Sequence, residues 1–149
     1  MKTILAAIDF SDVSDTVLAK ATELAQQSSA HLWILHVAAP DPDFVGYEAG
    51  PQHVRDWRAN TLQKERRFLQ DKADELEDKI GIQITPLMAQ GPTADTILKE
   101  AADLKVDLIV LGSHGHGALY ELIVGTVTEA LLRASKFPVL VIPANQTES

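Results

Sequence analysis

With 149 residues, 46% of them hydrophobic, the chain is large enough for a packed core, and this composition excludes an intrinsically disordered protein. The formal net charge of −8 argues against nonspecific binding to nucleic acids or anionic membranes, although it allows a local site for a small anion. The chain has no cysteine, which excludes disulfides and thiol catalysis, and no apolar stretch approaches the roughly 20 residues of a membrane span.

The apolar stretch at the N-terminus ends at Asp9, which makes it too short for a signal peptide. We therefore expect a cytoplasmic protein that does not insert into a membrane. The sequence contains no internal repeat and no linker, so we expect one domain over residues 1–143, followed by a short polar tail at 144–149.

The first half of the chain predicts two strands and two helices. Thr3–Ile8 is an apolar run typical of a strand buried on both faces, a helix is predicted over 16–27, and a second apolar strand over 31–37. Residues 38–51 contain three prolines and two glycines, which indicates an irregular segment, either a lid over a site or a surface insertion. The charged segment 52–79 carries one narrow apolar stripe and predicts a long helix with a solvated outer face.

The second half continues this alternation of strands and helices. Pro86 cannot donate a backbone hydrogen bond, which indicates an edge position or an irregular end for its strand, and Thr93 is the expected N-cap of the helix that follows. The predicted elements are a strand at 82–88, a helix from 93, a strand at 106–111, a helix at 125–135 and a strand at 137–143.

The strict alternation predicts an α/β protein, with a parallel sheet and helices on both faces. The two most continuously apolar strands, Thr3–Ile8 and Leu108–Leu111, are expected in the interior of the sheet. Ligands bind such sheets at the carboxyl ends of the strands, where the strand order reverses. If these two strands flank that point, Asp9 and Gly112 face the same crevice.

A glycine-rich loop follows the fourth predicted strand. It contains Gly112, Gly115 and Gly117, and Gly125 and Thr126 then stand at an expected helix start. Glycines expose backbone N–H groups to a ligand, and a helix N-terminus adds unpaired donors and the positive end of the helix dipole. The pattern therefore predicts phosphate binding, with ordinary turn chemistry as the alternative. It is not a P-loop, because no Gly-Lys-Ser/Thr sequence follows.

The motif Gly112-Ser-His-Gly115, nine residues and Gly125-Thr126 resembles that of the nucleotide-binding universal stress protein family. The resemblance extends over the whole chain, from Ile8-Asp9 to the closing Pro138–Pro143. It implies a five-stranded parallel sheet in the order 3-2-1-4-5, of the Rossmann-like, adenine nucleotide alpha hydrolase-like type. It also implies ATP, ADP or AMP as the ligand, and the phosphates would supply most of the ligands of an accompanying Mg²⁺.

The resemblance also implies roles for single residues. The motif glycines and Thr126 would contact the phosphates and the ribose, Asp9 would lie beside the nucleoside, and the backbone of Val37 would face the adenine. From the residues alone, the alternative for Asp9 is a capping or loop residue, and the stronger alternative for Val37 is plain core. The nucleotide-binding residues expected in this way are Ala7, Asp9, Val37, Gly112, Ser113, His114, Gly115, His116, Gly125, Thr126 and Val127.

One position departs from the family pattern, because His116 stands where many members carry a basic residue. A neutral imidazole attracts phosphate less than Lys or Arg, so we expect weaker or more pH-dependent binding. His114 and His116 form a His-x-His pair, but further metal ligands are not evident beside them, and we assign no metal site. His31 and His36 are interpreted as strand-end residues.

Three classes of function are compatible with these residues. The first is a nucleotide-binding regulatory module, and the second is a slow ATP hydrolase. Efficient catalysis is not expected, because Asp9 is the only acid near the predicted crevice and the glycine loop has no Lys or Arg, so no residue is assigned as catalytic. The third is a protein-binding adaptor with a vestigial pocket, which the intact glycine spacing disfavours. A phosphoacceptor receiver domain is excluded, because Met88-Ala89-Gln90 lacks the required Asp.

The last apolar stretch, Val139–Ile142, is expected at an edge of the sheet, where unpaired backbone groups invite another strand. Universal stress proteins commonly dimerise in this way, so the resemblance implies a homodimer through strand 138–142. The alternative is an edge that the chain's own tail or helices cover. A regulatory protein partner is expected, but the sequence does not identify it, and we expect no nucleic acid partner.

Overall fold

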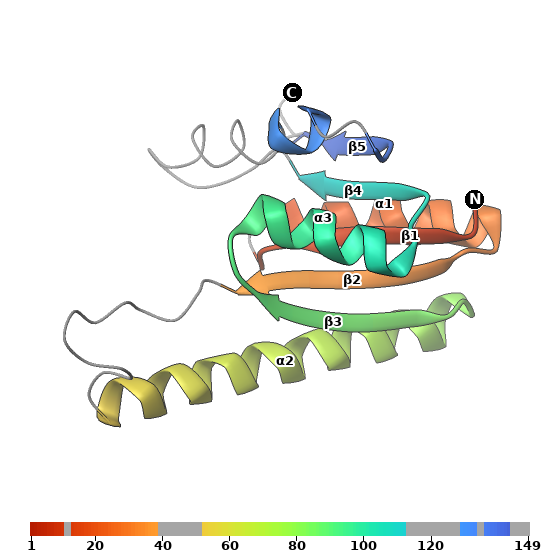
Figure 1. Ribbon diagram of the computed structural model, residues 1–149. Coiled ribbons are helices and arrows are strands. Elements are labelled where there is room, and N and C mark those ends of the chain that lie inside the picture. The colour runs from red at the N-terminus through yellow and green to blue at the C-terminus, as the bar shows by residue number, and fades with distance from the viewer. Residues whose placement is uncertain (11–12, 39–51, 113–128, 134–135, 144–149) are drawn as a thin grey trace.

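The computed structural model describes residues 1–10, 13–38, 52–112, 129–133 and 136–143, without the side chains of 13 and 52–55. In these residues, five parallel strands form one sheet in the order β3-β2-β1-β4-β5, which confirms the expected fold class (Figure 1). The strands are β1 (Thr3–Ile8), β2 (His31–Ala38), β3 (Ile84–Gln90), β4 (Leu108–Gly112) and β5 (Val139–Ile142). The helices are α1 (Val13–Ser28), α2 (Gln52–Ile80) and α3 (Thr93–Leu104), and residues 129–133 are also helical.

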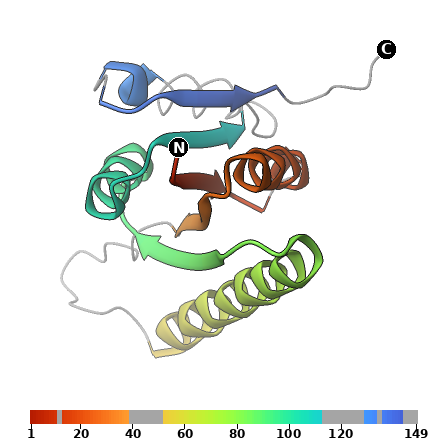
Figure 2. The ribbon, with the colours of Figure 1, turned by 90° about the vertical axis from the view of Figure 1, so that its right-hand side faces the viewer.

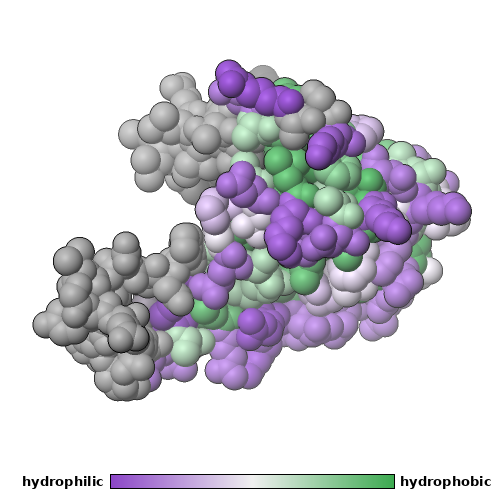
Figure 3. Space-filling model, viewed as in Figure 1, coloured by the Kyte–Doolittle hydropathy of each residue, from purple (hydrophilic) through white to green (hydrophobic). Residues whose placement is uncertain are grey.

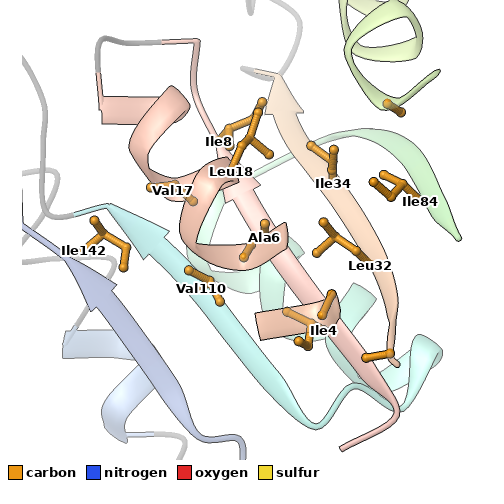
Figure 4. Packing of buried hydrophobic residues seen from close by; sticks show 14 of the residues in the cluster. Ile4, Ala6, Ile8, Val17, Leu18, Leu32, Ile34, Ile84, Val110 and Ile142 are labelled. Carbon is orange, nitrogen blue, oxygen red and sulfur yellow. The ribbon is translucent and has the colours of Figure 1, made fainter. Parts of the chain in front are cut away.

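Helices cover both faces of the sheet, as Figure 2 shows, with α1 and α2 on one face and α3 on the other. Successive side chains of β1 point alternately to the two faces of the sheet. Ile4, Ala6 and Ile8 belong to the cluster under α1 and α2 (Figure 4), whereas Leu5 packs with Ile97 of α3 on the opposite face. The two-sided burial explains why β1 reads as a continuous apolar run instead of an alternating pattern.

The interior of the sheet is formed by the strands that the sequence placed there. β1 pairs with β2 on one side and with β4 on the other, and β4 also pairs with β5. β3 and β5 are the edge strands of the described sheet. Pro86 lies within β3, which confirms that its strand is at an edge.

Several expected boundaries are wrong. Helix α1 begins at Val13 instead of residue 16, β4 begins at Leu108 instead of residue 106, and β5 spans Val139–Ile142 instead of residues 137–143. The starts of α3 and β3 also differ. The N-cap of α3 is Pro92, with an extended backbone and no side-chain cap, and Thr93 is the first helical residue. The helix begins there because Pro92 accepts its first intrahelical hydrogen bond, from Thr96 N at 2.9 Å. β3 begins at Ile84, which pairs with Leu32 of β2, and not at residue 82 as expected.

The outer face of the long helix α2 is solvated, as its charge pattern predicted. The surface over α3 and along the lower edge, where α2 lies, is largely hydrophilic in Figure 3. Leu69 and Ala73 of the narrow apolar stripe are buried against the sheet. Among the described helices, none has the length and hydropathy that a membrane span requires.

Candidate functional site

The strand order reverses between β1 and β4. From β1 the chain continues to β2 and β3 on one side of the sheet, then crosses to β4 and β5 on the other. In the register of this pair, Ala6 lies beside Val110, so the carboxyl ends of β1 and β4 reach the same edge of the sheet. Ligands of open α/β sheets bind outside the carboxyl ends of the strands at such a reversal point.

The structure brings together the expected site residues that it describes. Asp9 follows β1 directly, and Gly112 is the last residue of the adjacent β4. Ala7 and Val37 lie near the carboxyl ends of β1 and β2 and are partly buried toward α3. Val37 therefore contributes to the core, and its position at the strand end also leaves it beside the expected site.

The other expected site residues lie outside the described residues, as does the proline-rich segment from residue 39 to residue 51. The roles expected for these residues remain predictions. They concern Ser113, His114, Gly115, His116, Gly125, Thr126 and Val127.

Asp9 is exposed at the strand end and contacts the start of α1. The hydroxyl of Ser14, a buried residue, donates a hydrogen bond to Asp9 Oδ1 over 3.4 Å. This contact agrees with the interpretation of Asp9 as a loop residue that organises the helix start. One oxygen of the carboxylate is thereby directed toward the helix.

A cluster of four side chains lies beside Asp9, and sequence reasoning missed it. His36 is buried, with Nδ1 3.0 Å from the carbonyl oxygen of Ile8 and Nε2 3.6 Å from Glu65 Oε1. The ring of Phe10 lies 4.3 Å from the ring of His36 and 5.2 Å, edge to face, from that of Phe68. His36 is therefore a buried link between β1, β2 and α2, and not simply a strand-end residue.

The sequence holds a signal for this cluster. His36 follows Leu32 and Ile34 at alternating positions, which places it on a buried face of β2. Glu65 lies between Leu62 and Leu69 in the apolar stripe of α2, where a carboxylate needs a partner. Each residue breaks an apolar pattern, but neither pattern says that the two residues meet.

Gly91 closes the same edge of the sheet on the β3 side. Its backbone N–H donates to the carbonyl oxygen of Ala38 over 3.3 Å, which joins the ends of β2 and β3. Its φ of +144° disfavours other residues, and a Cβ atom there would lie 2.7 Å from Oγ1 of Thr96. The turn after β3 therefore needs glycine for reasons of backbone geometry.

The described residues contain no group of three His, Asp or Glu side chains placed to share a metal ion. The His114–His116 pair lies outside them. At the described edge of the sheet, the carboxylate of Asp9 follows β1, and the neighbouring strand β4 ends in Gly112. These groups can receive hydroxyl and anionic groups of a ligand without a metal of their own.

This sheet order, with a polar strand end at the reversal point, defines a Rossmann-like α/β protein. The profile of the universal stress protein family matches residues 1–143. The universal stress protein YxiE of Bacillus subtilis is 34% identical over 143 residues, which cover 93% of this chain and 97% of the relative. The chain therefore belongs to the universal stress protein family.

Solved structures agree with this assignment. A universal stress protein from Burkholderia pseudomallei superposes with a TM-score of 0.73 at 27% identity, with 96% of each chain covered. A universal stress protein in complex with cAMP has a TM-score of 0.69 at 22% identity, covering 97% of this chain and 98% of its own. The latter likeness concerns the fold.

Proposed function

We propose that this chain binds an adenine nucleotide at the carboxyl ends of β1 and β4 and acts as a regulatory module whose output depends on the bound state. The observation that carries the proposal is the placement of Asp9 and Gly112 at adjoining strand ends where the strand order reverses. A carboxylate there can accept hydrogen bonds from ribose hydroxyls, and backbone N–H groups of a glycine loop can receive phosphate. The structure of a family member with cAMP supports the choice of adenine.

The rest of the proposed site follows from the family motif in the sequence. Gly115, Gly125 and Thr126 would hold the phosphates and the ribose, and the backbone of Val37 would face the base. ATP is the first candidate ligand, and Mg²⁺ would bind chiefly through its phosphates. In this proposal the protein is a cytoplasmic homodimer that changes its interaction with a protein partner when the nucleotide is bound.

Calorimetric titration with ATP, ADP, AMP and cAMP tests the proposal. We expect Asp9→Asn to weaken binding about tenfold, because the substitution removes the charge from the hydrogen bonds to the ribose. Asp15→Asn is the matched control, since Asp15 is an exposed acid of α1 whose ion pair with Lys72 spans 3.8 Å. Equal affinities for the wild type and Asp9→Asn would remove Asp9 from the site.

A second variant addresses the glycine loop. Gly115→Val adds a side chain where the phosphate would approach the backbone, so we expect binding to be lost while the unfolding temperature stays near that of the wild type. Unchanged ATP affinity in this variant would refute the loop assignment. Mass spectrometry of nucleotide released from the purified protein separates the classes, because ATP indicates a binding module, ADP or AMP indicates turnover, and no nucleotide favours an adaptor.

A further inference from the structure

The backbone on both sides of Asp9 is fixed by contacts with one buried histidine. His36 Nδ1 lies 3.0 Å from the carbonyl oxygen of Ile8, the residue before Asp9. Because a carbonyl oxygen only accepts, Nδ1 carries the proton of this hydrogen bond. Phe10, the residue after Asp9, places its ring against the ring of His36. The turn that presents Asp9 therefore depends on the position of this imidazole.

The other end of the imidazole reaches the long helix α2. Nε2 of His36 lies 3.6 Å from Oε1 of Glu65, and the His36 and Glu65 side chains are 9% and 29% exposed. An imidazole nitrogen and a carboxylate oxygen at this distance attract each other when a proton lies between them. His36 thus links the Ile8 carbonyl of β1 to a carboxylate of α2.

Phe10 provides a second contact between the same two elements. Its φ of 63° lies in the left-handed region, which is costly for a bulky side chain and persists where surrounding contacts hold it. The ring packs against His36 and, at a ring-centroid distance of 5.2 Å, against Phe68 of α2. A shift of α2 would therefore release both the ring and the imidazole that hold the turn.

The contacts of Glu65 and Phe68 lie near the middle of α2. Among the described side chains of this helix, none from residue 56 to residue 68 is buried, and Leu69 is the first buried one. Leu69 and Ala73, which are buried in the core under this helix, follow these contacts along the chain.

We propose that His36 and Glu65 form a positioning pair that couples the placement of helix α2 to the nucleotide affinity of the site at Asp9. The inference rests on the proposed function, because it assigns Asp9 to the nucleotide. It goes further by naming α2 as the element through which a protein partner would tighten or loosen the site. Neither His36 nor Glu65 touches the ligand in this scheme.

Substitutions at Glu65 test the coupling by calorimetry with ATP. Glu65→Ala removes the contact with Nε2, and we expect about threefold to tenfold weaker binding, the range of a contact-mediated coupling. Glu65→Gln can donate an amide N–H to a neutral Nε2, so we expect it to restore the wild-type affinity. Glu75→Ala, which removes an exposed carboxylate from the same helix, is the matched control and should bind like the wild type.

A double-mutant cycle separates coupling from a general loss of structure. The amide of Asn reaches the position of Nδ1 but not that of Nε2, so His36→Asn keeps the donor to Ile8 and loses the link to α2. The double variant His36→Asn with Glu65→Ala should therefore bind no more weakly than Glu65→Ala alone. Fully additive losses would overturn the coupling.

Nuclear magnetic resonance gives a readout that does not require the nucleotide. Long-range proton–nitrogen correlations should show a protonated Nδ1 in His36, and Glu65→Ala should shift the amide signals of Asp9 and Phe10. A neutral His36 with its proton on Nε2 would overturn the inference, as would wild-type affinity in Glu65→Ala together with unshifted amides. If the wild type binds no nucleotide, the proposed function fails and this inference fails with it. A proton on Nε2, or unchanged affinity and amide signals in Glu65→Ala, would overturn this inference alone and leave nucleotide binding intact.

Discussion

Lys105 ends helix α3 in a left-handed conformation, with φ of 56°. Its N–H donates to Ala102 O at 3.2 Å, and Val106 N–H donates to Ala101 O at 3.1 Å, so this conformation satisfies the last carbonyl groups of the helix. Glycine adopts it without the steric cost that a Cβ atom brings. We expect Lys105→Gly to raise the free energy of unfolding by about 0.5–1 kcal/mol in urea titrations.

Lys105→Ala is the control for this prediction. It removes the same charge but keeps the Cβ atom. The difference in the free energy of unfolding between the two variants therefore reports the conformational preference of the backbone alone. If the alanine variant is as stable as the glycine variant, the left-handed conformation carries no cost at this position.

Asp107 fastens the amino end of β1 to the start of β4. Its Oδ2 accepts hydrogen bonds from the backbone N–H groups of Lys2 at 2.7 Å and Thr3 at 3.0 Å. These two hydrogen bonds, with that from Lys2 the stronger cause, lower the pKa of Asp107 below its ordinary value of 3.8. The carboxylate therefore stabilises the fold fully above that pH, and the contribution is lost as the pH falls through the lower pKa of the folded state.

The corresponding variant is Asp107→Asn. We expect it to unfold at a lower urea concentration than the wild type at pH 7, and the difference should shrink as the pH falls below about 4. Asp71→Asn, at an exposed position on α2, should show no such convergence. A gap between wild type and Asp107→Asn that stays constant down to pH 2 would contradict the assignment.

At the scale of elements, the sequence predicted most of what local pattern can determine. β1 is buried on both faces, so its apolar run identified it, and Pro86 identified an edge strand. The strand order came from the family resemblance, because periodicity does not say which strands pair. The start of β3 was missed by two residues, since the pairing of Ile84 with Leu32 sets it and not the apolar character of Ile82.

The candidate site also has one part that the sequence predicted and one part that it did not. The expectation that Asp9 and Gly112 face one crevice came from a general rule about strand ends in parallel sheets, and the structure shows that β1 and β4 are neighbouring strands. The contact between His36 and Glu65 did not follow, because it joins residues from β2 and α2 whose distance depends on how the helix lies against the sheet. Local patterns indicate that each side chain lies on the inner side of its element, but only the tertiary structure identifies its partner.

At the scale of the whole molecule, β5 leaves one edge of the described sheet available to a second copy of the chain. Val139, Leu140 and Val141 are partly exposed, and Ile142 is buried. Ile109 N–H donates to Pro138 O at 2.9 Å, so the alternation of a parallel pair directs the backbone groups of Val139 and Val141 away from β4. An apolar edge with outward donors and acceptors favours pairing with another strand.

We therefore expect a homodimer in which two β5 strands pair about a twofold axis, and sedimentation velocity at about 10 μM should detect it. Val141→Pro removes an outward N–H and leaves the bonds to β4 in place, so it should shift the protein to a monomer that stays folded by circular dichroism. Val141→Thr, which keeps the N–H and the branched shape, should remain a dimer. A dimeric Val141→Pro would move the interface to another surface, and a monomeric wild type would exclude a homodimer at that concentration, because the edge would then be tolerated or covered within one chain.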